Sequence, residues 1–180
     1  MADWQTIRLE SGRTQFRIPP GWSADITFEE TEVGTVDRAA VLRPDGQQQL
    51  RFGHTPGDVG GTCEPSAELL ESTPTALGEG QGSSEPTFAA VAVEREDGRW
   101  TFAAGIAEAS HLTAPLGCPF YFLVGGPGGG VLTFSTELEL RPSGGDPLWI
   151  VDSRDAALAY LETEEYALLK QILLSLEYLV

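Results

Sequence analysis

The chain has 180 residues, 41% of them hydrophobic and 21% charged, which is the composition of an ordinary globular protein. Its 27 acidic residues outnumber its 11 basic residues and give a formal net charge of -16. Such a surface repels phosphate backbones and anionic lipid headgroups, so we expect no nucleic-acid partner. No apolar run reaches the ~18 residues of a membrane-spanning helix, and the length suits one domain over residues 1–180.

The N-terminal sequence is patterned as two strands. Ile7 and Leu9 alternate with polar neighbours, and so do Phe16 and Ile18, which is the period of half-buried strands. Pro19-Pro20-Gly21 should end the second strand, because proline has no backbone donor for a ladder.

Three hairpins are expected farther along the chain. The strand pairs and their turns are Val36–Arg43 with Gln47–Gly53 through Pro44-Asp45-Gly46, Thr87–Arg95 with Arg99–Ala107 through Asp97-Gly98, and Pro119–Val124 with Val131–Leu140 through Gly125–Gly130. Asp-Gly between two alternating segments is the strongest of these turn signals.

Two other stretches in the middle of the chain are informative. Phe120–Val124 is apolar on both faces, which predicts a central strand covered on both sides. Gly57–Ser84 is rich in Gly, Pro, Ser and Thr and is expected to be a surface loop within the domain. Inside it, Ala67–Leu77 fits either a short helix or an irregular strand.

The C-terminal part changes to helical periodicity. Ser153 or Asp152 should cap one helix, and Thr163 should cap a second that runs to about Leu179. The buried face of the second helix should consist of Tyr166, Leu169, Ile172, Leu173 and Leu176. Together these patterns predict an α+β fold, in which a C-terminal helix, with one other helix as an option, packs on an antiparallel β-sheet.

No catalytic, cofactor-binding or metal-binding residue is predicted. The glycine runs Gly78–Gly82 and Gly125–Gly130 lack the Lys-Ser/Thr ending of a phosphate loop. Ser110-His111 could pair a nucleophile with a base, but no Gly-x-Ser-x-Gly turn surrounds the serine. For His111, and for His54 at a strand end, a structural or surface role is the expectation.

Cys63 and Cys118 are the only cysteines, and both lie in loops. We expect them to form a disulfide, which persists only in an oxidising compartment. The alternatives are two free thiols, or a zinc site with His54 and His111. Each His precedes a Cys, by nine and seven residues, and that spacing fits a structural zinc site poorly.

Trp149 stands between a glycine-rich break and the first C-terminal helix. The favoured interpretation is that it fills the edge of the sheet under the helix. The alternative is an exposed anchor for a partner, because tryptophan is enriched among binding hot spots. Trp149 is therefore the candidate partner-binding residue of the sequence.

The two ends of the chain carry a family resemblance. The opening strands end in Phe16-Arg17-Ile18-Pro19-Pro20-Gly21-Trp22, and the closing helix ends in Leu173-Leu174-Ser175-Leu176. The chain thereby resembles the PsbP/Mog-like superfamily, and within it the LpqN-type lipoproteins of actinobacteria. The resemblance implies an antiparallel sheet sandwiched by helices and no catalytic residues, because members act mostly as binding or accessory proteins.

Two functions are carried forward from the sequence. The first is a non-enzymatic binding or accessory domain of the cell envelope, the soluble part of a lipoprotein, as the resemblance and the two cysteines favour. The second is a cytoplasmic adaptor or chaperone that binds an apolar segment of a client. Met1–Trp4 contains no leader-like segment. The first function therefore implies an extracytoplasmic location with membrane anchoring through a leader absent from this chain, and a cytoplasmic location is the alternative. The ligand or partner and the oligomeric state are not predicted, and no cofactor is expected.

Overall fold

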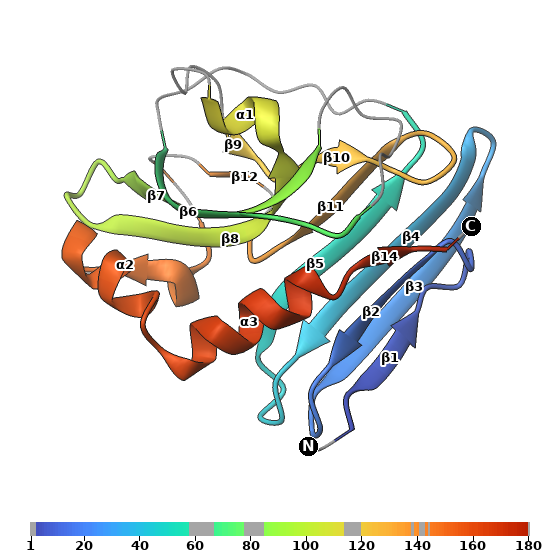
Figure 1. The fold of residues 1–180 in the computed structure, drawn as a ribbon, viewed down its shortest axis with the longest axis horizontal. Coiled ribbons are helices and arrows are strands. Elements are labelled where there is room, and N and C mark those ends of the chain that lie inside the picture. The colour runs from blue at the N-terminus through green and yellow to red at the C-terminus, as the bar shows by residue number, and fades with distance from the viewer. Residues whose placement is uncertain are drawn as a thin grey trace.

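The computed structural model describes residues 3–57, 67–77, 85–113, 120–137, 139–140, 143 and 145–179. Within these ranges the chain has an α+β fold with antiparallel sheets, as predicted (Figure 1). In chain order the elements are β1 (Gln5–Arg8), β2 (Thr14–Ile18), β3 (Ser23–Thr31), β4 (Gly34–Leu42), β5 (Gln48–Thr55), β6 (Glu68–Pro74), β7 (Pro86–Glu94), β8 (Trp100–Glu108), α1 (Ala109–Thr113), β9 (Phe120–Tyr121), β10 (Val124–Gly125), β11 (Val131–Ser135), β12 (Glu139–Leu140), the 3-10 helix η1 (Pro147–Trp149), β13 (Ile150–Val151), α2 (Arg154–Tyr160), α3 (Glu164–Leu174) and β14 (Glu177–Tyr178).

Nine strands form the main sheet. Its order is β3-β4-β5-β11-β8-β7-β6, with β10 paired to β11 and β13 paired to β8. The expected β4–β5 and β7–β8 hairpins are confirmed, and the third is shorter than expected, since β10 contributes only two residues to its pair with β11. The β7–β8 turn depends on Gly98, whose φ is 79°. Residues that carry a Cβ atom rarely adopt this backbone conformation, whereas glycine does so without strain.

The inner face of the main sheet is covered by a second sheet and by two helices. The second sheet has the order β1-β2-β14 and lies over the β3–β5 half, where Phe16 of β2 contacts Phe134 and Phe52 with ring centroids 4.8 and 6.2 Å away. Helices α2 and α3 lie over the β7–β8 half (Figure 1). This arrangement buries one large apolar core between the layers.

Helix α3 begins as the sequence predicts and ends earlier. Thr163 caps it by accepting a hydrogen bond from Tyr166 N, and Ser153 caps α2 in the same way. The helix stops at Leu174 and does not continue to Leu179, so the predicted C-terminal boundary is wrong. Ser175 Oγ accepts a hydrogen bond from Arg17 N, and the following residues pair with β2 as β14. Ladder bonds to β2 thus replace the last helical turn.

The buried helix face is the predicted one. Tyr166, Leu169, Ile172 and Leu173 are buried within α3, and Leu176 is buried just beyond its end. No helix among the described residues combines the length and the apolar character that crossing a membrane requires.

The outer face of the main sheet is covered over β7 and β8. A second, smaller apolar cluster there joins Phe122, Leu140 and Leu112 to the small residues of the two strands. Phe120–Val124 is not a central strand, which corrects the prediction: among the described residues β9 pairs with β12 alone, in a separate two-stranded sheet. The strands that are buried on both faces are β7 and β8, whose alanines and valines pack against α3 on one side and Phe122 on the other.

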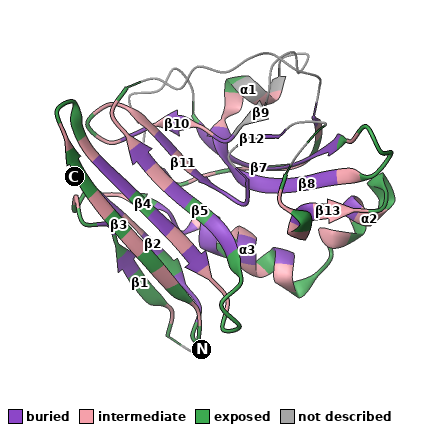
Figure 2. Cartoon of the chain, turned by 180° about the vertical axis from the view of Figure 1, so that it is seen from behind, coloured by how far each residue is buried: buried purple, intermediate pink, exposed green. Residues whose placement is uncertain are grey.

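Among the described residues, the outer face of the main sheet is open over β3, β4 and β5 (Figure 2). Figure 2 shows exposed and half-buried positions alternating along β3, and exposed or half-buried positions alternating with buried ones along β4 and β5, whereas β7 and β8 are buried almost throughout. At the opposite edge, the ambiguous segment Ala67–Leu77 proves to contain β6, an irregular strand with a bulge between Leu69 and Glu71. The rest of Gly57–Ser84 lies mostly outside the described residues.

Candidate functional site

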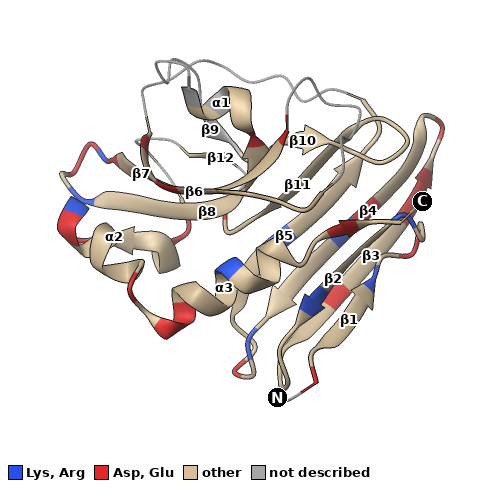
Figure 3. Cartoon of the chain, in the orientation of Figure 1, with Lys and Arg blue, Asp and Glu red and all other residues tan. Residues whose placement is uncertain are grey.

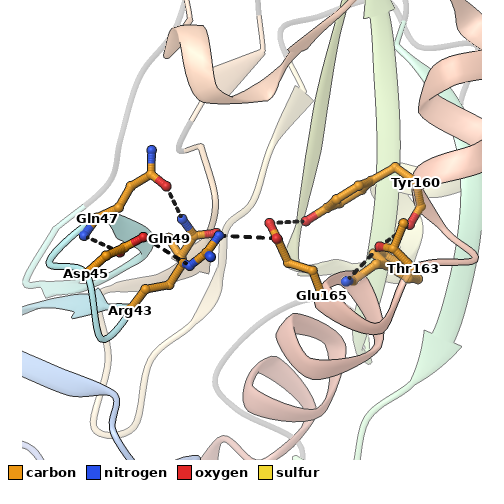
Figure 4. A network of polar contacts seen from close by, with 8 residues as sticks. Arg43, Asp45, Gln47, Gln49, Tyr160, Thr163 and Glu165 are labelled. Atoms are coloured by element: carbon orange, nitrogen blue, oxygen red, sulfur yellow. Dashed lines mark hydrogen bonds and ion pairs between the residues drawn. The ribbon is translucent and has the colours of Figure 1, made fainter.

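A polar bridge joins the β4–β5 hairpin to the start of α3 (Figure 4). Arg43 Nη1 lies 3.2 Å from Glu165 Oε2, and the Tyr160 hydroxyl donates to Glu165 Oε1 at 3.1 Å. Thr163 Oγ1 donates to the Tyr160 carbonyl oxygen at 2.7 Å while it caps α3. We call Arg43, Glu165 and Tyr160 the hairpin–helix bridge; it ties two elements that are 122 residues apart in the chain.

The tyrosine of the bridge belongs to an aromatic cluster. Its ring meets Phe102 edge-on at a centroid distance of 4.9 Å and lies 6.2 Å from Trp149 and 5.9 Å from Tyr166. Burial, together with the negative charge and hydrogen bonding of Glu165, raises the pKa of Tyr160. The phenol therefore remains a protonated donor, which suits a packing role better than proton abstraction.

A second cluster ties the edge strand β6 to α3. The Tyr166 hydroxyl and Lys170 Nζ both donate to the Glu71 carboxylate, and Lys170 Nζ also lies 5.4 Å from the Phe88 ring centroid. Burial acts to raise the pKa of Glu71, but the hydrogen bonds from Lys170 and Tyr166 and the Lys170 charge outweigh it and lower the pKa. Lys170 is the only lysine of the chain, and here it serves to hold α3 against the sheet.

A third polar cluster lies between the two sheets, at the ends of β4 and β5 that are distant from their connecting turn. Asp37 and His54 are directly opposite each other in the ladder and are 0% and 4% exposed. Asp37 Oδ1 accepts from Ser11 N at 3.3 Å, and His54 Nε2 is 3.0 Å from the Gly129 carbonyl oxygen. No donor among the described residues reaches Asp37 Oδ2. The contacts that are present hold the loop after β1 and the β10–β11 turn onto β4 and β5.

The structure describes only some of the residues that the sequence singled out. Helix α1, which contains Ser110 and His111, packs on the outer face through Leu112, whereas His54 shares the inner face with Phe52. Cys63 and Cys118 lie outside the described residues. No group of three or more metal-ligating side chains is arranged to hold a metal ion within the described ranges.

Trp149 is 4% exposed and packs against Phe102 and Tyr160. It sits in η1, which Asp146 caps by accepting a hydrogen bond from Leu148 N at 3.0 Å. This placement matches the interpretation of a side chain that fills the sheet edge under the helices. A side chain so deeply buried does not fit the alternative of an exposed anchor.

The polar clusters were not anticipated, although a signal for one of them is present in the sequence. Asp37 lies on the same face of β4 as the buried Ala39 and Val41, and His54 lies on the same face of β5 as the buried Leu50 and Phe52. Because every second residue of a strand faces the same side of the sheet, this pattern predicts Asp37 and His54 in the interior. The bridge from Arg43 to Glu165 has no comparable local signal, because its partners meet only through the tertiary fold.

Strand β3 forms one edge of the main sheet. This strand pairs with β4 over nine consecutive residues without a bulge, and no other described strand pairs with it. Asp25, Thr27 and Glu29 are exposed on the outer face, and Ile26 and Phe28 are half-buried on the inner face. Figure 3 shows acidic positions gathered toward the tip of the β3–β4 hairpin.

Comparison of the chain with protein-family models, with curated proteins and with solved structures finds no match.

Proposed function

We propose that the protein is a non-enzymatic binding or accessory domain of the cell envelope, the folded part of a lipoprotein of the PsbP/Mog-like kind. The observation that carries the proposal is the asymmetry of the main sheet. Among the described residues, one half of the sheet is covered on both faces, whereas the other half has an open outer face and an open edge at β3. A regular strand with a free edge is a surface to which another polypeptide can add.

The polar side chains of the interior support a binding role over a catalytic one. Glu165, Glu71 and His54 each make contacts that join separate elements of the fold. Tyr160 and Tyr166 are held in the protonated state, since burial and neighbouring carboxylates raise the pKa of both hydroxyls. Such groups stabilise the scaffold that presents the open half of the sheet.

The non-enzymatic part of the proposal is tested with the purified protein. Ester, peptide, phosphate and glycoside substrates should turn over at background rates. Turnover that is retained through purification and lost in His54→Ala or His111→Ala protein would overturn this part.

The binding part is tested by site-specific photo-crosslinking in the organism of origin. A photoreactive residue is placed at Thr27 or Val33 on the open half, or at Ala159 on the helical side; all three positions are exposed. We expect a discrete crosslinked partner from at least one position, and crosslinks from none would contradict a binding role. Protease added to cells stripped of their wall should degrade the protein, whereas full protection would place it in the cytoplasm and favour an adaptor or chaperone.

A further inference from the structure

We infer that the free edge of β3 binds an extended segment of a partner protein that carries two basic residues four positions apart on one face and small apolar residues on the other face. The inference rests on the proposed binding function and names the site and the chemistry of its occupant.

The backbone of β3 is ready to accept another strand. All nine residues from Ser23 to Thr31 are in register with β4, so the strand is long and unbulged. In an antiparallel ladder every second residue directs its N–H and C=O groups away from its one neighbour. An added strand would satisfy these groups, and they supply affinity whatever the sequence of the partner.

The opposite edge of the sheet is protected, and the contrast is informative. Strand β6 is interrupted by a bulge and ends at Pro74, and both features discourage further pairing. Its acidic residues are also occupied: Arg154 of α2 binds Glu68 through a bidentate pair, and α3 binds Glu71. Strand β3 has neither a bulge nor a proline.

The side chains of β3 define what should lie beside it. The outer row contains Asp25 and Glu29, separated by Thr27, and β3 has no basic residue. Among the described residues, Arg38 alone forms an ion pair with an acidic residue of this row, and its Nη1 lies 3.7 Å from Glu29 Oε2. More than half of each of these two side chains is exposed. An exposed pair of that length neutralises little. Two basic side chains four residues apart in an added strand would face Asp25 and Glu29.

The inner row of β3 side chains determines which residues the partner segment needs on its other face. Ala24, Ile26 and Phe28 face the core layer but are only half-buried, because no strand lies beyond them in the described chain. Small apolar side chains from an added strand would extend the core over these residues and bury the remaining apolar surface. The two rows together predict basic residues on one face of the partner segment and small apolar residues on the other face.

A second copy of this chain is the wrong occupant for electrostatic reasons. Antiparallel pairing centred on Thr27 would place Asp25 opposite Glu29 twice, and parallel in-register pairing would place each acidic residue beside its own copy. Like charges at directly opposed positions destabilise a strand pair. The charges that attract a basic segment therefore also prevent self-association along this edge.

The test uses the full chain and a nine-residue peptide that matches β3 in length. The sequence Thr-Val-Lys-Val-Thr-Val-Lys-Val-Thr reads the same in both directions, so it places lysines beside Asp25 and Glu29 in either orientation. Its binding is measured by fluorescence anisotropy and mapped by amide chemical shifts. We expect the largest shifts in β3, and affinity about tenfold above that of the same peptide with glutamate in place of lysine, a preference that diminishes with added salt.

Protein variants supply the matched control. The double variant Asp25→Lys with Glu29→Lys should reverse the preference, so that the glutamate peptide binds better. Asp152→Lys with Glu162→Lys makes the same change in net charge at exposed sites near α2 and α3 and should leave the preference unaltered. All four positions are exposed, so folding should be retained, and circular dichroism checks it.

Three results would overturn the inference: equal affinity for the two peptides, shifts centred away from β3, or a preference that follows net charge in both double variants. These results are distinct from a failure of the proposed function. A discrete partner that crosslinks at Ala159 but never at Thr27 would leave the binding role in place and remove β3 as its site.

Discussion

At the scale of single residues, charge and burial are balanced most closely at Glu71. This carboxylate lies at the sheet edge and accepts from both Tyr166 and Lys170 of α3. Burial alone would favour the neutral acid, but the two donors hold the pKa below the ordinary value of 4.5. A glutamate with a lowered folded-state pKa stabilises the fold above pH 4.5, and this contribution is lost as the pH falls through the folded pKa.

Glu71→Gln should therefore lower the free energy of unfolding at neutral pH by about 1 kcal/mol, since the side chain is partly exposed. The difference from the unsubstituted protein should disappear as the pH falls below 4.5. Urea unfolding at a series of pH values measures it. Glu68→Gln, in the same strand but at a more exposed pair, is the control and should cost less. A pH-independent difference for Glu71→Gln would show that the charge is not its cause.

Gly105 illustrates a residue that is required for close packing. A Cβ atom at this position in β8 would lie 2.5 Å from Ser135 Cβ and 2.6 Å from the Phe122 ring, closer than real contacts allow. Gly105→Ala should therefore destabilise the protein by ~1–3 kcal/mol, as overpacking does. Gly53→Ala in β5 is a gentler control, because its Cβ would meet Thr133 Cγ2 at 3.2 Å. Equal melting temperatures for the two variants would contradict the packing described around Phe122.

At the scale of elements, α3 is the main contributor from the C-terminal part to the inner core. Its buried residues contact both the β7–β8 half of the sheet and β2, so the helix links the two sheets of the sandwich. The same chain segment then continues into β14, which pairs with β2. Helix and strand thus fasten the C-terminus to both layers.

Ile172→Asp should abolish folding, because a buried, unpaired carboxylate costs several kcal/mol against a total stability of ~5–15 kcal/mol. Gln171→Asp places the same carboxylate on the exposed side of α3 and should change stability by no more than about 0.5 kcal/mol. Expression, circular dichroism and thermal unfolding distinguish the two. If Ile172→Asp folds with an unchanged melting temperature, the helix is not packed as described.

At the scale of the whole molecule, the cellular compartment depends on the cysteines. Cys63 and Cys118 lie outside the described residues, so their pairing remains a prediction from the sequence. A bond between them would close a loop of about 56 residues and contribute ~4 kcal/mol on the chain-entropy estimate. Such a bond would support the proposed extracytoplasmic location, because it persists only under oxidising conditions.

Thiol titration of denatured, unreduced protein should find no free thiol. Cys63→Ser, Cys118→Ser and the double variant should all lose the same stability, because any of them removes the whole bond. Two titratable thiols in protein prepared under oxidising conditions, or additive losses in the two single variants, would show that the cysteines are independent. The proposed location would then lose its support from the cysteines.

The sequence by itself determined the features that depend on local periodicity and local chemistry. Asp97-Gly98 marked the β7–β8 turn, Thr163 marked the start of α3, and the spacing of Leu169, Ile172 and Leu173 identified its buried face. Each is set by side-chain alternation, a turn conformation or a cap that neighbouring residues provide. The class of fold follows from these patterns.

Only the tertiary structure decided the features that depend on partners distant in the chain. Phe120–Val124 has the composition of a central strand, yet the central positions belong to β7 and β8, because composition does not determine which strands pair. Helix α3 ends early because Ser175 and Glu177 find partners in β2, about 160 residues away. The free edge of β3 is likewise a property of the strand order, since no local pattern shows which strand will lack a second neighbour.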